Sequence, residues 1–192
     1  MGSEMCIRDR LRGRKLQNPT DDRVRPTSDR IREALFNVLA HGSFGDFSFP
    51  NARVLDLFAG TGALGLEAVS RGAPFALFVD DHTASRGLIR TNAEDLGVTG
   101  RIKLYKRNAT RLGPRPASAG PAFNLVFADP PYGKGLGEKA LTAALEGDWI
   151  TPDALIVLEE DRDQSLSPPP GFVEVDRRIY ATTQILILQR PS

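Results

Sequence analysis

The chain of 192 residues contains one cysteine and two histidines. The single cysteine, Cys6, cannot form an internal disulfide, which suits a reducing cytoplasm, and it leaves no cysteine-rich zinc site. No apolar run approaches the ~18 residues that a membrane-spanning helix requires, and the charged start lacks the apolar stretch of a secretory signal. These shortages favour a cytoplasmic protein without a membrane segment or a resident metal, and we expect a monomer.

Charge is unevenly distributed along a chain whose net charge is only +1. Residues 8–32 carry nine Lys or Arg against four Asp, a net charge of +5, which leaves the rest of the chain at −4. A basic arm on a mildly acidic body can steer a polyanion such as a nucleic acid towards the protein. On charge alone, a solvated N-terminal tail explains the same pattern, because runs of charge are common.

The length predicts one domain, since domains commonly span about 100–200 residues. We leave residues 1–11 out of the expected fold as a non-native or disordered start, and we take 12–27 as a basic N-terminal arm. Residues 28–192 then form a single domain. It opens with a helix that Thr27 or Ser28 can cap, and its apolar residues recur with helical spacing at Ile31, Leu35, Val38 and Leu39.

From residue 52 onward, short apolar runs alternate with segments of helical periodicity. This alternation predicts an α/β fold with a mostly parallel sheet. In such sheets, ligands bind at the carboxyl ends of the strands, near the point where the strand order reverses. Strands are expected at 52–58, 74–80, 101–107, 123–129 and 154–160, helices at 62–72, 84–97 and 137–147, and a closing β-hairpin at 172–178 and 183–189.

A glycine-rich turn, GTGALG, follows the first of these strands at residues 60–65. Glycines let the backbone pass close to a ligand, and the start of the next helix supplies N–H donors. Asp80 ends the following strand, 18 residues after Gly62, where a carboxylate can accept both ribose hydroxyls. The glycine turn is a weak signal alone, but strand, helix and acid together favour an adenosine-bearing ligand over a ligand-free turn.

The identity of that ligand depends on Asp56, which lies in the strand four residues ahead of Gly60. A negative charge there repels the pyrophosphate of a dinucleotide but suits the ammonium group of S-adenosylmethionine, directly or through water. The sequence therefore favours the methyl donor over NAD. Asn108 and Ala109 follow the third strand, where a polar side chain could reach the adenine amine; an asparagine that only forms a turn is an equal alternative.

The fourth strand ends in Asp129-Pro130-Pro131-Tyr132. Two consecutive prolines fix an extended turn and remove two backbone donors, so the outward groups are acceptors, the Asp129 carboxylate and the Pro130 carbonyl. An exocyclic base amine is a poor nucleophile because its lone pair is delocalised into the ring. Two acceptors that hold its hydrogens draw the nitrogen towards tetrahedral geometry while Tyr132 stacks on the base. The motif therefore predicts in-line methyl transfer that needs no metal.

Together these residues resemble the bacterial family of small-subunit ribosomal RNA guanine-N2 methyltransferases, which modify one guanosine of 16S RNA. The similarity runs from residue 12 to about 190. The glycine turn and Asp-Pro-Pro-Tyr are shared with other amino-methyltransferases, whereas the pair RGRKL (12–16) and RPTSDRIREALFNVL (25–39) is more specific. Further matching stretches are VLDLFAGTGALGLEAVSRGA (54–73), FVD (78–80), LIRTN (88–92) and FADPPYGKGL (127–136).

The resemblance implies a Rossmann-like class I methyltransferase fold, with a seven-stranded sheet, helices on both faces and an antiparallel last strand. It implies S-adenosyl-L-methionine as cofactor and 16S ribosomal RNA or the small subunit as partner. The cofactor residues carried over by position are Asp56, Phe58, Ala59, Gly60 and Gly62 at the methionine end, Asp80 at the ribose, and Asn108 with Ala109 at the adenine. The catalytic residues carried over are Asp129, Pro130 and Tyr132. An arm from Arg12 to Arg32 is expected to cover the site and contact RNA, with Arg12, Arg14, Lys15, Arg25 and Arg30 as RNA-binding residues.

Three other readings stay open from the sequence. Asp-Pro-Pro-Tyr serves adenine as well as guanine amines, so an N6-adenine methyltransferase acting on RNA or DNA is the main alternative. A NAD-dependent oxidoreductase would use the same glycine turn, but Asp56 and Asp-Pro-Pro-Tyr argue against it. A non-catalytic RNA-binding protein that kept the fold is disfavoured by the intact Asp129 and Tyr132.

Overall fold

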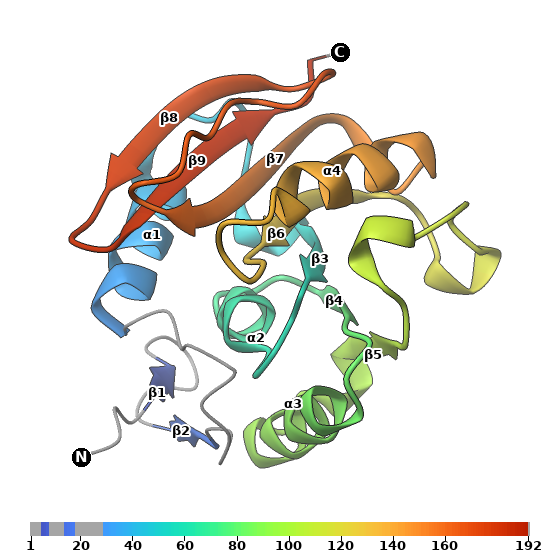
Figure 1. Cartoon of the computed structure of the whole chain (residues 1–192). Coiled ribbons are helices and arrows are strands. Elements are labelled where there is room, and N and C mark those ends of the chain that lie inside the picture. The colour runs from blue at the N-terminus through green and yellow to red at the C-terminus, as the bar shows by residue number, and fades with distance from the viewer. Residues whose placement is uncertain (1–4, 8–13, 18–28, 192) are drawn as a thin grey trace.

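The computed structural model describes residues 5–7, 14–17 and 29–191, and Figure 1 shows how their elements are arranged. The strands are β1 (Met5–Ile7), β2 (Arg14–Leu16), β3 (Arg53–Leu57), β4 (Phe75–Val79), β5 (Ile102–Tyr105), β6 (Phe123–Ala128), β7 (Ile150–Asp161), β8 (Val173–Ile179) and β9 (Thr183–Gln189). The α-helices are α1 (Asp29–His41), α2 (Ala63–Ser70), α3 (Thr83–Leu96) and α4 (Leu136–Glu146), and short 3₁₀ turns are η1 (Phe49–Asn51), η2 (Thr99–Arg101), η3 (Ala109–Arg111) and η4 (Ala117–Ala119).

Seven strands form one sheet in the order β5-β4-β3-β6-β7-β9-β8 (Figure 1). The pairs from β5 to β7 are all parallel, and β9 is antiparallel to both β7 and β8. This sheet confirms the expected class I methyltransferase fold. The strand order reverses at β3, since β4 lies on one side of it and β6 on the other, so the carboxyl ends of β3 and β6 are where ligands are expected.

Helices cover both faces of the sheet. Successive strand residues point to opposite faces, and on β3 the residues of both faces are buried. On β3, Val54 packs into the apolar cluster that includes residues of α1, α2 and α3, whereas Leu55 and Leu57 pack into a second cluster that includes α4. The longest helix, α3, has 14 residues. Within the described ranges, no helix has the length and apolar character to cross a membrane.

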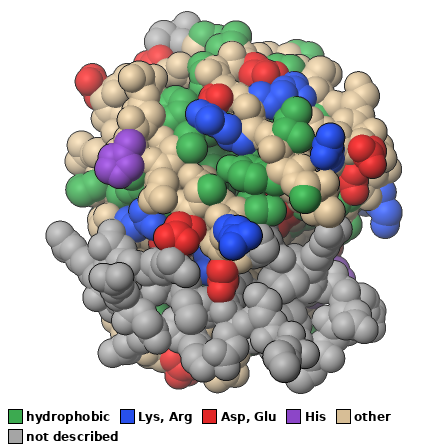
Figure 2. All heavy atoms as spheres, turned by 90° about the vertical axis from the view of Figure 1, so that its left-hand side faces the viewer, with side chains coloured by type: hydrophobic (Ala, Val, Ile, Leu, Met, Phe, Trp, Pro, Cys, Tyr) green, Lys and Arg blue, Asp and Glu red, His purple; other side chains and the backbone are tan. Residues whose placement is uncertain are grey.

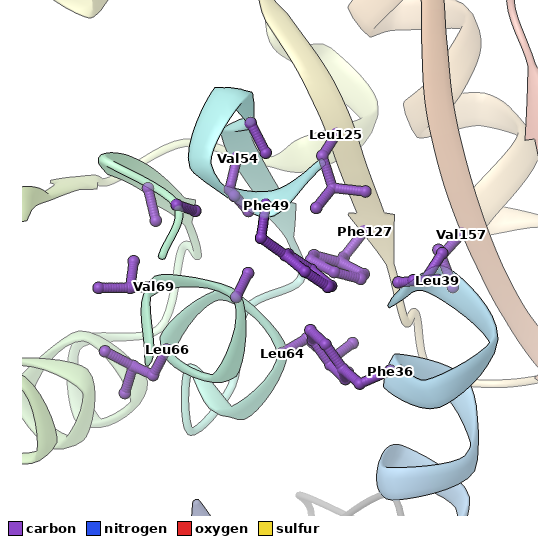
Figure 3. Close-up of a cluster of buried hydrophobic side chains, with 14 of the residues drawn as sticks. Phe36, Leu39, Phe49, Val54, Leu64, Leu66, Val69, Leu125, Phe127 and Val157 are labelled. Carbon is purple, nitrogen blue, oxygen red and sulfur yellow. The ribbon is translucent and has the colours of Figure 1, made fainter. Parts of the chain in front are cut away.

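Helix α1 lies on the sheet through the apolar stripe that the sequence predicts. Leu35, Phe36 and Leu39 are buried. The Phe36 ring stacks on Phe49, with 5.6 Å between centroids, and lies 5.7 Å from the Phe127 ring of β6 (Figure 3). Burying one such side chain contributes roughly 1.5–3 kcal/mol, so this cluster fixes α1 to the sheet. The predicted caps of the helix, Thr27 and Ser28, lie outside the described residues.

Two elements differ from the expected ones. Met5–Ile7, in the segment left out of the expected fold, pairs with Arg14–Leu16 of the arm as a two-stranded antiparallel sheet. Strand β7 begins at Ile150 rather than at Ala154, because Ile150 pairs with Phe123 of β6. A register shift in this pairing and a positive φ of 59° at Asp153 absorb the irregular segment between them. Turn-forming residues such as Pro and Asp predicted a later start because they are rare inside strands.

Candidate active site

Four neighbouring strands bring the predicted site residues to one edge of the sheet. In spatial order, Asn108 follows β5, Asp80 follows β4, the turn 58–62 follows β3, and Asp129 follows β6. Because these strands are parallel, their carboxyl ends share this edge. The glycine turn and the Asp-Pro-Pro-Tyr motif therefore follow adjacent strands.

The turn after β3 contains three residues with positive φ. Phe58, Gly60 and Gly62 have φ angles of 59°, 54° and 77°. Glycine adopts this region readily, but for Phe58 it costs on the order of 1–3 kcal/mol, a kind of strain that gathers at ligand sites. The Gly62 N–H closes the turn by donating to the Ala59 carbonyl at 2.7 Å, and α2 begins at the next residue.

Gly65, the last glycine of the turn, lets α2 approach the sheet. A Cβ at this position would lie 2.4 Å from the Phe78 ring and 3.0 Å from Oδ2 of Asp56. The close approach allows the Gly65 N–H to donate to Asp56 Oδ2 at 2.9 Å. This glycine is therefore required for packing between helix and sheet.

Asp56 is buried beneath the turn, with 2% of its surface exposed. Burial raises the pKa of its carboxyl to about 8, against the opposing effect of the Gly65 N–H and with a smaller contribution from the charge of Asp80. Burial therefore favours the neutral form of this carboxyl in the empty site, and a cation bound beside it would favour the charged form that the sequence argument assumed.

Asp80 connects the glycine turn to the end of β4. Its Oδ2 accepts the Gly60 N–H at 2.9 Å, and its Oδ1 accepts the His82 N–H at 2.8 Å. A carboxylate has about four lone-pair positions, so capacity remains for further donors such as hydroxyl groups. Asp80, Asp81 and His82 could by spacing also hold a metal ion, with ligand atoms within 4.8 Å of one another. The two backbone donors explain the orientation of Asp80 without one.

Asn108 acts as the cap of η3. Its Oδ1 accepts the Thr110 N–H at 2.9 Å and the Thr110 hydroxyl at 2.7 Å. Its Nδ2 lies 3.4 Å from Asp81 Oδ2, which places Asn108 beside the end of β4, and Ala109 behind it is buried. The turn-forming role is thus observed, and contact with an adenine remains a prediction.

Asp129 directly follows β6, at the level of the glycine turn. The register pairs Ala128 of β6 with Leu57 of β3, so Asp129 and Phe58 each follow a paired residue. Asp129 is half-buried and Pro130 is buried. The acceptor residues of the motif therefore lie beside the turn, as expected for motifs at the ends of adjacent strands.

Tyr132 is held by two strands that the sequence analysis did not connect with it. Its hydroxyl donates to Oε1 of Glu159 at 2.6 Å, at the end of β7, and lies 3.1 Å from Oγ1 of Thr183, at the start of β9. Burial and the adjacent Glu159 carboxylate raise the pKa of Tyr132 far above its ordinary value, so the hydroxyl stays protonated. The next residue is also fixed, because the Gly133 N–H donates to Glu160 Oε1 at 2.9 Å.

Glu159 and Glu160 are thus site residues that the sequence analysis missed. Both are only 3% exposed, and buried carboxylates require hydrogen-bond partners. Their signal lies in the segment ALIVLEE (154–160), where two acids end an otherwise apolar strand at the edge of the sheet that binds ligands.

The predicted RNA-binding residues are only partly within the described chain. Arg12 and Arg25 lie outside the described residues, Arg14 and Lys15 belong to β2, and Arg30 is exposed in the first turn of α1. Arg32, at the end of the expected arm, is only 2% exposed, and its guanidinium pairs with Asp29 at 2.9 Å. RNA contact by the five residues predicted for it stays a prediction.

Comparison with known proteins identifies the family of the chain. The chain matches the family described as conserved hypothetical protein 95 over residues 7–189, a match that starts before residue 12, where the resemblance was expected to begin. It is 38% identical over 181 residues to ribosomal RNA small subunit methyltransferase D of Escherichia coli (strain K12), covering 94% of this chain and 86% of that protein. The protein of the same name from Haemophilus influenzae is 33% identical over 162 residues, covering 84% and 80%.

Among solved structures, yhhF from Escherichia coli has a TM-score of 0.78 at 31% identity, with 99% of each chain covered. HI0767 from Haemophilus influenzae also has a TM-score of 0.78, at 26% identity and with both chains fully covered. The similarity thus extends over the whole fold. The chain therefore belongs to the conserved hypothetical protein 95 family, which includes the ribosomal RNA small subunit methyltransferase D proteins.

Proposed function

We propose that this protein transfers a methyl group from S-adenosyl-L-methionine to the exocyclic N2 amine of a guanine in 16S ribosomal RNA. One observation carries the proposal: Asp-Pro-Pro-Tyr lies beside a glycine turn at the ends of the paired strands β6 and β3. Relatives named as ribosomal RNA small subunit methyltransferases support the substrate class. The choice of guanine rests on the resemblance at residues 12–16 and 25–39, and such a substrate implies a cytoplasmic protein.

The residues around the glycine turn fit the chemistry of S-adenosylmethionine. Asp80 is oriented by two backbone N–H groups and keeps acceptor capacity for ribose hydroxyls. Asp56, whose pKa is raised by burial, would gain a favourable partner in the ammonium group. Phe58, Ala59, Gly60 and Gly62 would line the methionine end, and Asn108 with Ala109 would flank the adenine. When bound, the cofactor supplies a methyl group on a sulfonium that a nucleophile can attack.

The residues after β6 would prepare the amine for that attack. The Asp129 carboxylate and the Pro130 carbonyl accept its two hydrogens and localise the lone pair on nitrogen. Tyr132 stacks on the base, and the hydrogen bond from its hydroxyl to Glu159 fixes the plane of the ring. The nitrogen would form a bond to the methyl carbon while the bond from that carbon to sulfur breaks and leaves a neutral thioether, and the proton that the nitrogen then loses would pass to the Asp129 carboxylate. Orientation and electrostatics thus supply the acceleration.

RNA contact is assigned to the basic residues before and at the start of α1, namely Arg12, Arg14, Lys15, Arg25 and Arg30. The face that carries α1 also shows Lys and Arg side chains among hydrophobic side chains and some Asp and Glu (Figure 2). Reversing Arg12, Arg14 and Lys15 to Glu is expected to weaken RNA binding and flatten its salt dependence. Each lost phosphate contact lowers the logarithmic salt slope by roughly 0.7–0.9. An unchanged slope with unchanged cofactor affinity would instead favour the solvated-tail interpretation.

The direct test is to methylate small ribosomal subunits that lack the modification, using a labelled donor, and to separate the nucleosides after digestion. Label in N2-methylguanosine is the expected result, and the Asp129→Ala protein, whose turnover should be strongly reduced, serves as the control. Label in N6-methyladenosine instead would support the adenine alternative.

A further inference from the structure

Asn92 of α3 connects two segments that are distant in sequence. Its side chain is fully buried. The amide Nδ2 donates to the Thr61 carbonyl at 3.1 Å, inside the glycine turn, and to the Gln17 carbonyl at 3.4 Å, directly after β2. The amide Oδ1 accepts the Gln17 N–H at 2.8 Å. One side chain therefore bridges the N-terminal segment and the glycine turn.

These three bonds use both N–H donors and the oxygen acceptor of the Asn92 amide group. An asparagine amide has two N–H donors, and here one is taken by each carbonyl. Towards Gln17 the amide donates and accepts as a paired backbone would, so it extends the hydrogen bonding of the segment that contains β2. Because the Asn92 side chain is buried, a shift of either segment would leave part of its amide group without a hydrogen-bond partner.

Other contacts hold the same N-terminal segment in place. Leu16, the residue before Gln17, is only 4% exposed and belongs to the apolar cluster beneath α1 and α2. Strand β1 contacts α2, the helix that starts from the glycine turn, and Figure 1 shows β1 and β2 beside it. The Gln17 side chain adds an exposed contact, from Nε2 to Asp95 Oδ2 at 3.4 Å.

We propose that Asn92 is a positioning residue that couples residues 14–17 to the glycine turn after β3. The inference rests on the proposed function, because the ligand of the turn is taken to be S-adenosylmethionine. A ligand that fixes Thr61 also fixes Asn92, and through it the backbone of Gln17. Coupling between two binding sites is reciprocal. RNA bound at Arg14 and Lys15 would therefore tighten cofactor binding by the same factor by which the bound cofactor tightens RNA binding.

The test measures hydrogen exchange of the Gln17 amide with and without saturating S-adenosylhomocysteine. The unaltered chain is expected to slow this exchange by about fivefold or more when the ligand is bound, the lower end of ordinary coupling. Asn92→Asp keeps the size and the acceptor but places a carboxylate oxygen against two carbonyls. In this variant the ligand-induced slowing should fall below about twofold. Asp95→Asn is the matched control, since it changes the exposed Gln17 side-chain contact without touching the three bonds of Asn92, and it should respond like the unaltered chain.

A second variant keeps the test valid if Asn92→Asp does not fold. Gln17→Pro removes the N–H that Asn92 accepts and leaves α3 and the turn intact, and it should weaken S-adenosylhomocysteine binding by about fivefold. Ligand binding with unchanged Gln17 exchange in the unaltered chain would overturn the coupling alone. Absence of ligand binding to the unaltered chain would overturn the proposed function, and the coupling with it.

Discussion

Removing the hydroxyl oxygen of Tyr132 should separate two roles of that side chain, the proposed stacking of its ring on the base and the hydrogen bond of its hydroxyl to Glu159. Tyr132→Phe keeps the ring but deletes the hydroxyl that donates to Glu159 at 2.6 Å and contacts Thr183 at 3.1 Å. A hydrogen bond to a charged group contributes about 1.5–3 kcal/mol. The deletion also leaves the buried Glu159 without this donor, so we expect a loss of about 2 kcal/mol in the free energy of unfolding.

The same deletion should slow methyl transfer while cofactor affinity stays unchanged. Without its bond to Glu159 the ring is no longer fixed in one plane, and a small misplacement of the stacked base lowers turnover. We expect a loss on the order of tenfold or more. Unfolding is measured by denaturant titration, turnover with labelled donor, and cofactor affinity by calorimetry.

Tyr105→Phe is the matched control, because the Tyr105 hydroxyl also makes a 2.6 Å hydrogen bond, but to the neutral, exposed Ser118. This control should cost about 0.5–1.5 kcal/mol and leave turnover unchanged. In a double-mutant cycle, Tyr132→Phe and Glu159→Gln should show a coupling of about 0.5–3 kcal/mol. A Tyr132→Phe protein as stable and as active as the parent would refute the anchoring role of Glu159.

Three further predictions concern the carboxylates at the ends of β3, β4 and β6. Asp80→Ala should weaken cofactor binding by about 1.5–3 kcal/mol in calorimetry, the value of hydrogen bonds to a charged group; normal affinity would mean that the ribose lies elsewhere. Asp129→Ala should lower turnover by on the order of a hundredfold while cofactor affinity changes little, and an equal loss of affinity would move Asp129 into the cofactor site. Because the pKa of Asp56 is raised to about 8, the empty protein holds a proton there at pH 7, and an arriving ammonium group favours its release. Calorimetry at pH 7 in buffers of different ionisation enthalpy should therefore detect nearly one proton released per cofactor bound, a signal that Asp56→Asn should abolish.

The strand ends could be predicted from the sequence because their signals are local. Gly60 and Gly62 mark the turn after β3, and both have positive φ in the structure. The two prolines after Asp129 mark the end of β6. These residues act through backbone conformation, which depends on immediate neighbours. The sheet followed from the same local alternation of apolar runs and helical segments.

Contacts between side chains far apart in sequence could not be predicted in the same way. Tyr132 and Glu159 are 27 residues apart, and Gln17 and Asn92 are 75 apart. The local sequence pattern does not predict which buried acid or amide bonds to which partner. It indicates only that a buried polar group requires a hydrogen-bond partner. The raised pKa of Asp56 likewise depends on burial under α2, which is a property of the packed fold.

The antiparallel strand β9 explains why the proposed base-binding residue Tyr132 depends on the C-terminal hairpin. In a purely parallel sheet, the edge that binds ligands contains only the carboxyl ends of strands. Because β9 runs in the opposite direction, its first residue, Thr183, lies opposite Asp161 at the end of β7. Its hydroxyl therefore reaches Tyr132 from the same edge as Glu159. The reversed strand thus supplies one of the two groups that hold Tyr132, which links the direction of this strand to the chemistry of the proposed reaction.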